Sequence, residues 1–540
     1  MTRLLDRALT RALRLPPTTS KYSVRRDLEV PLRDGVVLLA DLYQPAGAPL
    51  GTVLVRSPYG RAGAFAAMFA RPYAARGYQV VIQSCRSTFG SGGEVNAFAG
   101  EVEDGADTVA WLRTQPWFTG TFATLGLSYL GFTQWALLTD PPPELVAAII
   151  SSGPHDAGRL LYGSGALNLI SAVGWAYAMT HQEDHGPVVG AVVQAATSDK
   201  TMAPALNGLP LGEAAHSVFG DKAPWHDRWL AHPDPGDPFW DSGRLTAALD
   251  KVTVPVMLVS GWQDLILEQV LEQYAALSAR DVDVALTVGP WNHADLLTKG
   301  GGLSTRQTLG WLDEHLAGTG KRLQTSSAQV HVTGSGEWRD LPSWPPATST
   351  QTLYLQPGGG LGEHAPPESP PVTFRYDPTD PTPTVGGLSN ARTAGTRDNR
   401  DLEARADVVT FTGPVLEADL EVAGTVAVEL DHGSDNPHAD LFVRLCEVDA
   451  KGVSRNLCER FTRLDPERTD DRVTVELSAV AHRFRAGTRV RLQVSGGSFP
   501  QHDRNLGTGE PPASGSQMTP SHRTIAIGSS RLHLPVDPTP

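Results

Sequence analysis

The chain of 540 residues is too long for one hydrophobic core, so we expect about three domains. Its net charge of −14, without any block of clustered Lys and Arg, argues against a nucleic-acid partner, because phosphate binding depends on basic patches. A hydrophobic fraction of 40%, together with 54 Gly and 42 Pro, is typical of a folded protein with many turns and excludes a disordered chain.

Residues 1–15 carry leucines at helical spacing with interspersed arginines. They lack the continuous apolar core of a secretory signal. The chain also contains no run of about 18 apolar residues, so we expect no membrane span. We expect a short helix docked on the protein, with a surface-binding or targeting helix as the alternative. The cysteines Cys85, Cys446 and Cys458 form no C-x-x-C pair, and we expect Cys85 to be buried. Three cysteines without such a pair fit a reducing compartment, so the expected location is the cytoplasm.

From residue 22 onward, predicted strands alternate with predicted helices in the pattern of a mostly parallel sheet. The expected elements are a hairpin over 23–45, strands over 52–60, 78–86, 122–128 and 147–153, and helices over 62–77 and 101–117. The alternation then stops, and residues 155–245 become helical and rich in aromatic side chains. It resumes with a strand, a helix and a strand between residues 254 and 293. This order predicts an α/β domain interrupted by an inserted helical cap.

Short alternating strands begin beyond about residue 325, the first of them at 327–334. Their Gly-, Pro- and Asp-rich connections are typical of an antiparallel sandwich or jelly roll. Residues 357–405 predict a long surface excursion. The expected domains are an α/β domain in two parts (1–145 and 246–325), a helical cap (146–245) and a C-terminal, galactose-binding-like jelly roll (326–540).

The sequence "GLSYLG" places Ser128 between an expected strand and an expected helix. This strand-turn-helix arrangement exposes a serine hydroxyl at the top of a sheet, as in the Gly-x-Ser-x-Gly nucleophile elbow. Leu130 stands where the second glycine of that motif belongs, and Gly131 follows one residue later. The motif alone is weak, and a serine that caps the following helix is the alternative.

A serine nucleophile needs an imidazole base that is itself oriented by a carboxylate. Asp264 and His293 each follow an expected strand, in the chain order Ser, Asp, His of α/β-hydrolases. Singly, Asp264 fits a turn or helix cap and His293 fits an ordinary loop histidine, but their joint placement predicts a catalytic triad. Other residues could serve as acid or base, but they satisfy the chain order and the position directly after a strand less well: Asp241, Asp281, Asp295, His185 and His232.

Negative charge on the substrate oxygen must meet preorganised donors. The backbone N–H of Tyr129 supplies one donor, and the loop "RSPYGR" is expected to supply the other, through its main chain or the phenol of Tyr59. Packing beside Pro58 is the alternative for Tyr59. Trp175 in the cap and Trp262 beside the acid are candidate substrate-pocket residues, with plain core packing as the alternative for each.

"GLSYLG" followed by "TQW" closely resembles the G-x-S-Y-x-G elbow of the CocE/NonD hydrolases, the superfamily of bacterial cocaine esterase, X-Pro dipeptidyl-peptidases and α-amino-acid ester hydrolases. Other stretches agree in order along the chain: "RSPYGR", "VVIQSCR", "GSGGE", "EDGADTVAWLRTQPW", "SGWQD", "GPWNH", "RYDPTDPTPTVGG" and "HADLFVRLCEVDAKG". The resemblance implies an α/β-hydrolase domain with a helical cap and a C-terminal jelly roll. It assigns Ser128 as nucleophile, Asp264 as acid, His293 as base, and Tyr59 with the Tyr129 amide as oxyanion donors.

The expected function is two-step acyl transfer from a small-molecule ester or short peptide, without a cofactor, a metal or a membrane. Ser84 stands where many family members have the Asp of Asp-x-Arg-Gly, which puts the ion pair of that aspartate in doubt. One alternative is an X-Pro dipeptidyl-peptidase, for which Glu183 and Asp184 are weak candidates to hold a free ammonium. A non-catalytic, carbohydrate-binding protein is another.

The sequence does not favour a metal site. His432 and His438 lie near several aspartates, but the spacing matches no ligand pattern. The sequence leaves the oligomeric state open, and a homo-oligomer is compatible with it.

Overall fold

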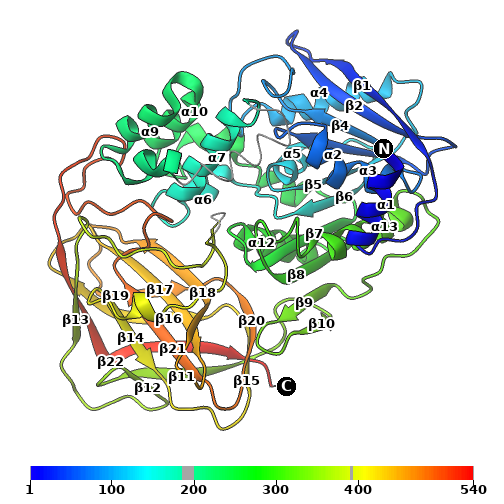
Figure 1. Ribbon diagram of the computed structural model, residues 1–540. Helices are drawn as coiled ribbons and strands as arrows, with labels where there is room; N and C mark the ends of the chain where they lie inside the picture. The colour runs from blue at the N-terminus through cyan, green and yellow to red at the C-terminus, as the bar shows by residue number, and fades with distance from the viewer. Residues whose placement is uncertain (1, 185–199, 390–392, 539–540) are drawn as a thin grey trace.

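Two β-sheets organise the protein, whose computed structural model describes residues 2–184, 200–389 and 393–538 (Figure 1). Within these residues a ten-stranded sheet occupies the N-terminal part of the chain, and a twelve-stranded sheet system occupies the C-terminal part. A group of helices lies beside the first sheet and above the second in the view of Figure 1. None of the described helices is long and apolar enough to cross a membrane.

The first sheet has the order β1-β2-β4-β3-β5-β6-β7-β8-β9-β10. The predicted hairpin forms its antiparallel edge, and the strands from β4 to β9 pair in parallel. Every residue of β3, β4 and β5 is buried, as expected for parallel strands covered by helices on both faces. The bounds are β1 Tyr22–Pro31, β2 Val37–Pro45, β3 Thr52–Ser57, β4 Gln79–Ser84, β5 Phe122–Leu127, β6 Leu145–Ser151, β7 Val256–Gln263 and β8 Val284–Asn292.

Helices follow most of these strands and bury the two faces of the sheet in separate hydrophobic clusters. They are α2 Gly63–Phe69, α3 Arg71–Ala74, α4 Glu101–Arg113, α5 Tyr129–Leu137, α12 Leu267–Ala279 and α13 Gly301–His315. The helix predicted over 62–77 is divided in two, with Pro72 in the first turn of α3, because proline lacks the N–H that a continuous helix would need there.

The N-terminal helix α1 (Thr2–Ala12) docks on this domain, as the main prediction for residues 1–15 states. The Asp6 carboxylate accepts a hydrogen bond from Tyr22 at 3.1 Å and pairs with Arg71 at 3.4 Å. Leu4 stays 70% exposed, so the apolar face is only partly covered.

The first sheet continues beyond residue 325, where we placed the start of the C-terminal domain. β9 (Ala328–Val332) pairs in parallel with β8, and β10 (Glu337–Leu341) pairs with β9. The strand predicted at 327–334 therefore exists but joins the first sheet, which corrects its predicted place. Alternating burial reveals a strand but carries no information about its partner.

The helical cap is inserted between β6 and β7, as predicted. Its elements are α6 Ala157–Tyr162, α7 Leu169–His181, α9 Leu211–Phe219, η1 Gly220–Lys222, α10 Pro224–Ala231 and η2 Pro238–Gly243, and α11 Ala247–Lys251 leads back to the sheet. Aromatic side chains of α7 and α10 pack against one another, with the rings of Trp175 and Trp229 5.6 Å apart.

The C-terminal domain is all-β, with one core of buried aliphatic and aromatic side chains. Within the predicted surface excursion, β13 pairs with the long strand β22, so this part of it belongs to the sheet. Asn456 donates to Gln263 at 3.3 Å, which joins this domain to the end of β7. The elements are β11 Ser349–Gln356, β12 Gly360–Gly362, β13 Val372–Tyr376, α14 Arg400–Glu403, β14 Val408–Thr412, β15 Leu420–Gly424, β16 Ala427–Ser434, β17 Asp440–Val448, β18 Ser454–Arg463, β19 Arg472–Glu476, β20 Val480–Phe484, β21 Arg489–Ser495 and β22 Ser521–Val536.

Candidate active site

Ser128 lies at the sharp turn between β5 and α5. Its φ of 61° and ψ of −122° put a non-glycine residue in a strained region of backbone conformation. The turn is held by the Ser128 N–H, which donates to the Ser151 carbonyl at 2.9 Å, and by the Gly131 N–H, which donates to the Ser128 carbonyl at 2.8 Å. The Ser128 hydroxyl makes no capping hydrogen bond to α5, so the helix-cap alternative is wrong.

Two glycines of "GLSYLG" are required by close packing at this turn. A Cβ on Gly126 would lie 2.3 Å from the Cβ of Leu130, and a Cβ on Gly131 would lie 2.5 Å from the Cα of Gly153. Gly131 therefore allows α5 to approach the loop after β6. Close backbone approach at this turn therefore requires the displaced glycine of the motif.

Asp264 and His293 come together at the carboxyl ends of β7 and β8. The imidazole Nδ1–H donates to the Asp264 Oδ2 at 2.9 Å, because an ionised carboxylate can only accept. The other oxygen, Oδ1, accepts from the Ile266 N–H at 2.7 Å, and the Asp264 side chain is 0% exposed. This pairing fixes the imidazole ring and leaves Nε2 available as an acceptor.

Tyr59 lies in the loop after β3 and contacts the cap. Its phenol oxygen accepts a hydrogen bond from the indole N–H of Trp175 at 3.0 Å, and its ring stacks on Phe65. Burial raises the pKa of Tyr59 to about 12, while hydrogen bonds with Trp175 and Ser128 act in the opposite direction. The phenol is therefore protonated at neutral pH, and it lines the same cavity as Ser128.

Tyr129, the residue after the serine, is anchored through its side chain. Its hydroxyl donates to Glu101 at 3.0 Å and accepts from the Phe98 N–H at 3.2 Å. Glu101 pairs at 2.8 Å with Arg56, and both charged side chains are almost completely buried. Burial is the main cause that raises the pKa of Glu101, and the Arg56 guanidinium opposes it. This network connects β3, α4 and the serine turn.

Sequence reasoning missed the Arg56–Glu101 pair. The only available signal was an acid-rich first turn in α4, which by itself is typical of any helix start.

The arginine next to Ser84 has carboxylate partners from elsewhere in the sheet. The Ser84 hydroxyl accepts from Arg61 at 2.9 Å, and Arg61 also pairs with Asp41 at 3.1 Å and with Asp27. The carboxylates that neutralise Arg61 thus come from β1 and β2. Cys85 is buried, as predicted, and burial raises the pKa of its thiol well above the usual value.

A small cavity of about 60 Å³ connects the predicted site residues. Its lining is mostly apolar and contains no carboxylate among the described residues: Tyr59, Phe98, Ser128, Tyr129, Pro154, Leu160, Leu161, Ser171, Ala172, Trp175, Trp229, Leu265, Ile266 and His293. One cavity is therefore lined by five of the predicted residues: Ser128, His293, Tyr59, Tyr129 and Trp175. Asp264 contacts His293 through the hydrogen bond described above.

Trp262 does not line this cavity, which corrects the prediction for that residue. Its indole N–H donates to the His331 carbonyl at 2.7 Å, and its ring packs against Trp344 at 5.0 Å. The pairing register of β7 with β8 shifts between Gly261 and Gln263. Because this irregularity disturbs the alternation of side chains along the strand, Trp262 and Asp264 do not lie on the same face of the sheet although they are close in sequence.

The alternative acids and bases lie elsewhere in the described structure. Asp241 pairs with Arg244, Asp295 pairs with Lys299, and His232 contacts Asp237. Asp281 lines another cavity. His185 is outside the described residues.

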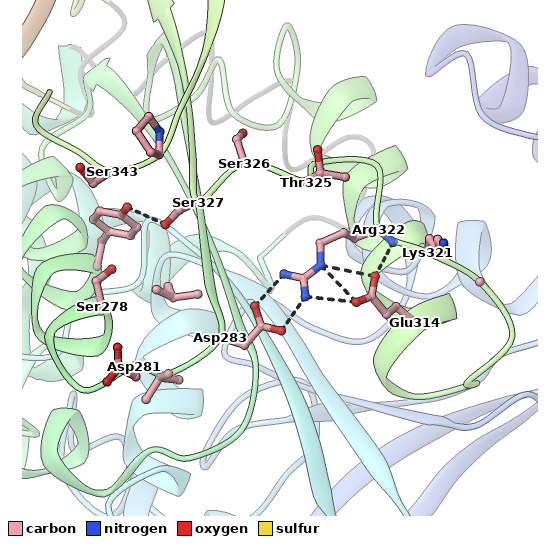
Figure 2. A pocket seen from close by; sticks show the side chains of 15 residues that line it. Ser278, Asp281, Asp283, Glu314, Lys321, Arg322, Thr325, Ser326, Ser327 and Ser343 are labelled. Atoms are coloured by element: carbon pink, nitrogen blue, oxygen red, sulfur yellow. Dashed lines mark hydrogen bonds and ion pairs between the residues drawn. The ribbon is translucent and has the colours of Figure 1, made fainter.

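A second cavity, of about 950 Å³, opens at the opposite edge of the sheet, around the start of β8 (Figure 2). Its most prominent polar group is Arg322, which is held by Asp283 at 2.6 Å and by Glu314 at 3.1 Å. It contains none of the predicted site residues. In the described residues no group of three or more His, Cys, Asp or Glu side chains could hold a metal ion.

Comparison with known proteins shows the family to which this chain belongs. Residues 34–295 match the X-Pro dipeptidyl-peptidase (S15 family), and residues 318–533 match the X-Pro dipeptidyl-peptidase C-terminal non-catalytic domain. The cocaine esterase of Rhodococcus sp. (strain MB1 Bresler) is 32% identical over 538 residues, which cover 90% of this chain and 93% of that esterase. The chain belongs to the CocE/NonD hydrolase family. Members of this family are serine esterases and peptidases, so the predicted family and class of enzyme are confirmed.

Solved structures agree with the fold of a CocE/NonD hydrolase. An α-amino acid ester hydrolase superposes with a TM-score of 0.80 at 22% identity, covering 96% of this chain and 97% of the other. An aminopeptidase from a marine sediment Thaumarchaeota archaeon gives a TM-score of 0.81 at 22% identity, covering 97% of both chains. These similarities confirm the α/β-hydrolase domain with a C-terminal all-β domain.

Proposed function

We propose that this CocE/NonD hydrolase cleaves carboxylic esters with Ser128 as nucleophile, His293 as general base and Asp264 as the group that orients the base. The observation that carries the proposal is the 2.9 Å hydrogen bond from His293 to Asp264 beside a strained serine turn in the same cavity. The Nε2 atom of His293 takes the hydroxyl proton as the Ser128 Oγ attacks the carbonyl carbon, and Asp264 stabilises the imidazolium that forms.

The negative charge that develops on the carbonyl oxygen is met by the Tyr59 O–H and the Tyr129 N–H. His293 then gives its proton to the leaving alcohol, and the acyl group remains on Ser128. A water molecule, activated by the same imidazole, releases the acid and regenerates the serine. The buried Arg56–Glu101 pair supports this machinery by holding Tyr129.

An ester with an apolar acyl group fits the cavity better than an X-Pro peptide. A dipeptidyl-peptidase has to bind a free ammonium group, for which buried carboxylates are the usual partners. The described lining of the cavity contains no carboxylate, and Glu183 accepts a hydrogen bond from the Phe89 N–H at 2.9 Å instead. Asp184 does not line the cavity either. We also propose a cytoplasmic location, which the buried, unpaired cysteines support.

The experiment compares Ser128→Ala with Ser152→Ala, a control at a buried serine in the neighbouring loop. We expect Ser128→Ala to lower kcat for 4-nitrophenyl esters about 10⁶-fold and to abolish labelling by a fluorophosphonate, while Ser152→Ala keeps both. Full turnover by Ser128→Ala would disprove the proposal. Faster turnover of an X-Pro anilide than of esters would favour the peptidase, and an unlabelled wild-type protein would favour a carbohydrate-binding role for the C-terminal domain.

A further inference from the structure

The cap reaches the loop of Tyr59 through two hydrogen bonds from one helical segment. Trp175 of α7 donates its indole N–H to the Tyr59 phenol oxygen at 3.0 Å. Gln182, at the end of α7, donates its side-chain amide to the Pro58 carbonyl at 2.9 Å. Both the side chain of Tyr59 and the backbone next to it are therefore positioned by the cap.

The direction of the Trp175–Tyr59 hydrogen bond determines where the phenol proton can point. An indole N–H can only donate, so the phenol oxygen must be the acceptor. The phenol has one proton, and this proton is then available on the side away from Trp175. Tyr59 and Ser128 line the same cavity, so a proton on that side faces the reacting atoms.

A donor on the phenol oxygen also strengthens the phenol as a donor. Hydrogen bonds in a chain polarise one another, and the effect grows where water is excluded. The orientation of Trp175 is fixed by stacking, since its ring lies 5.9 Å from that of Tyr129 with the planes 12° apart, and 5.9 Å from that of Phe98. The indole thus has the rigidity that a preorganised electrostatic contact needs.

We propose that Trp175 is a positioning residue whose indole N–H orients and polarises the Tyr59 phenol, so that helix α7 of the cap completes the oxyanion site. This inference rests on the proposed role of Tyr59. It gives Trp175 a role in turnover that is separate from its contact with the substrate as part of the cavity wall.

The test is a double-mutant cycle on kcat and KM with 4-nitrophenyl acetate. Trp175→Phe keeps an aromatic ring and removes the N–H, and a second variant carries β-(3-benzothienyl)alanine at position 175, which keeps the shape of the indole and replaces N–H by sulfur. Each change is made alone and together with Tyr59→Phe. Trp229→Phe is the matched control, because Trp229 lines the same cavity and packs on Trp175.

We expect both changes at position 175 to lower kcat about ten-fold with little effect on KM, and to have no further effect when Tyr59 is already Phe. Trp229→Phe should have the same effect in both backgrounds. Equal effects of Trp175→Phe in both backgrounds, or an effect on KM alone, would overturn the inference and leave Trp175 as cavity wall. A normal kcat for Tyr59→Phe would instead overturn the proposed role of Tyr59 itself. The benzothienyl variant decides the question if Trp175→Phe does not fold.

Discussion

Replacing Asp264 by Asn tests the role of the buried acid with little change in shape. The Asn oxygen can still accept from the Ile266 N–H, so the loop should keep its conformation. The Asn amide, however, would donate to Nδ1 of His293, which places the imidazole proton on Nε2, where it faces Ser128 and cannot accept the hydroxyl proton. The variant also loses the negative charge next to the imidazolium.

The expected size of the effect follows from the contact. At an effective dielectric constant of about 20, unit charges about 4 Å apart attract by about 4 kcal/mol, which corresponds to roughly 10³-fold in rate. Because the wrong tautomer adds to this loss, we expect kcat to fall about 10³–10⁴-fold.

The assay measures kcat with a 4-nitrophenyl ester and the rate of fluorophosphonate labelling, with the urea unfolding curve as a check on folding. Asp295→Asn is the matched control, because Asp295 follows the same histidine but pairs with Lys299. A loss smaller than ten-fold in a folded Asp264→Asn protein, or an equal loss in Asp295→Asn, would refute the assignment of the acid.

Further predictions concern the stability of the fold. Gly131→Ala should lower the free energy of unfolding by about 1–3 kcal/mol, because its Cβ meets the backbone of Gly153; an unchanged urea midpoint would contradict this. Glu101→Gln should cost about 3 kcal/mol, because it removes the nearer of two buried carboxylates that pair with Arg56 and leaves only Asp104, at 3.8 Å. The partly exposed Glu144→Gln should cost less than about 1 kcal/mol in the same urea assay. Burial lowers the pKa of His226 to about 4, so the unfolded state binds more protons below pH 6.5 and stability falls from there toward pH 4. His226→Phe should weaken this pH dependence in unfolding midpoints measured from pH 7 to pH 4.5, and an unchanged slope would count against the cause.

Much of the architecture could be predicted because strands and helices leave periodic patterns in the sequence. The parallel strands are short, mainly apolar runs, which marks them as buried strands. The strand at 328–332 shows the limit of such patterns, since its alternating burial fits either sheet, and only its pairing with β8 places it. The helix predicted over 62–77 failed where Pro72 interrupts it.

The sequence by itself determined the order of the elements and the positions of Ser128, Asp264 and His293 at the ends of strands, because local periodicity and chain order are properties of the sequence. Tertiary structure decided which side chains meet. Arg56, Glu101 and Tyr129 come from β3, α4 and α5, and Trp175 reaches Tyr59 from a cap more than a hundred residues away in the chain. Such contacts depend on how separate elements pack, and no local pattern records that geometry.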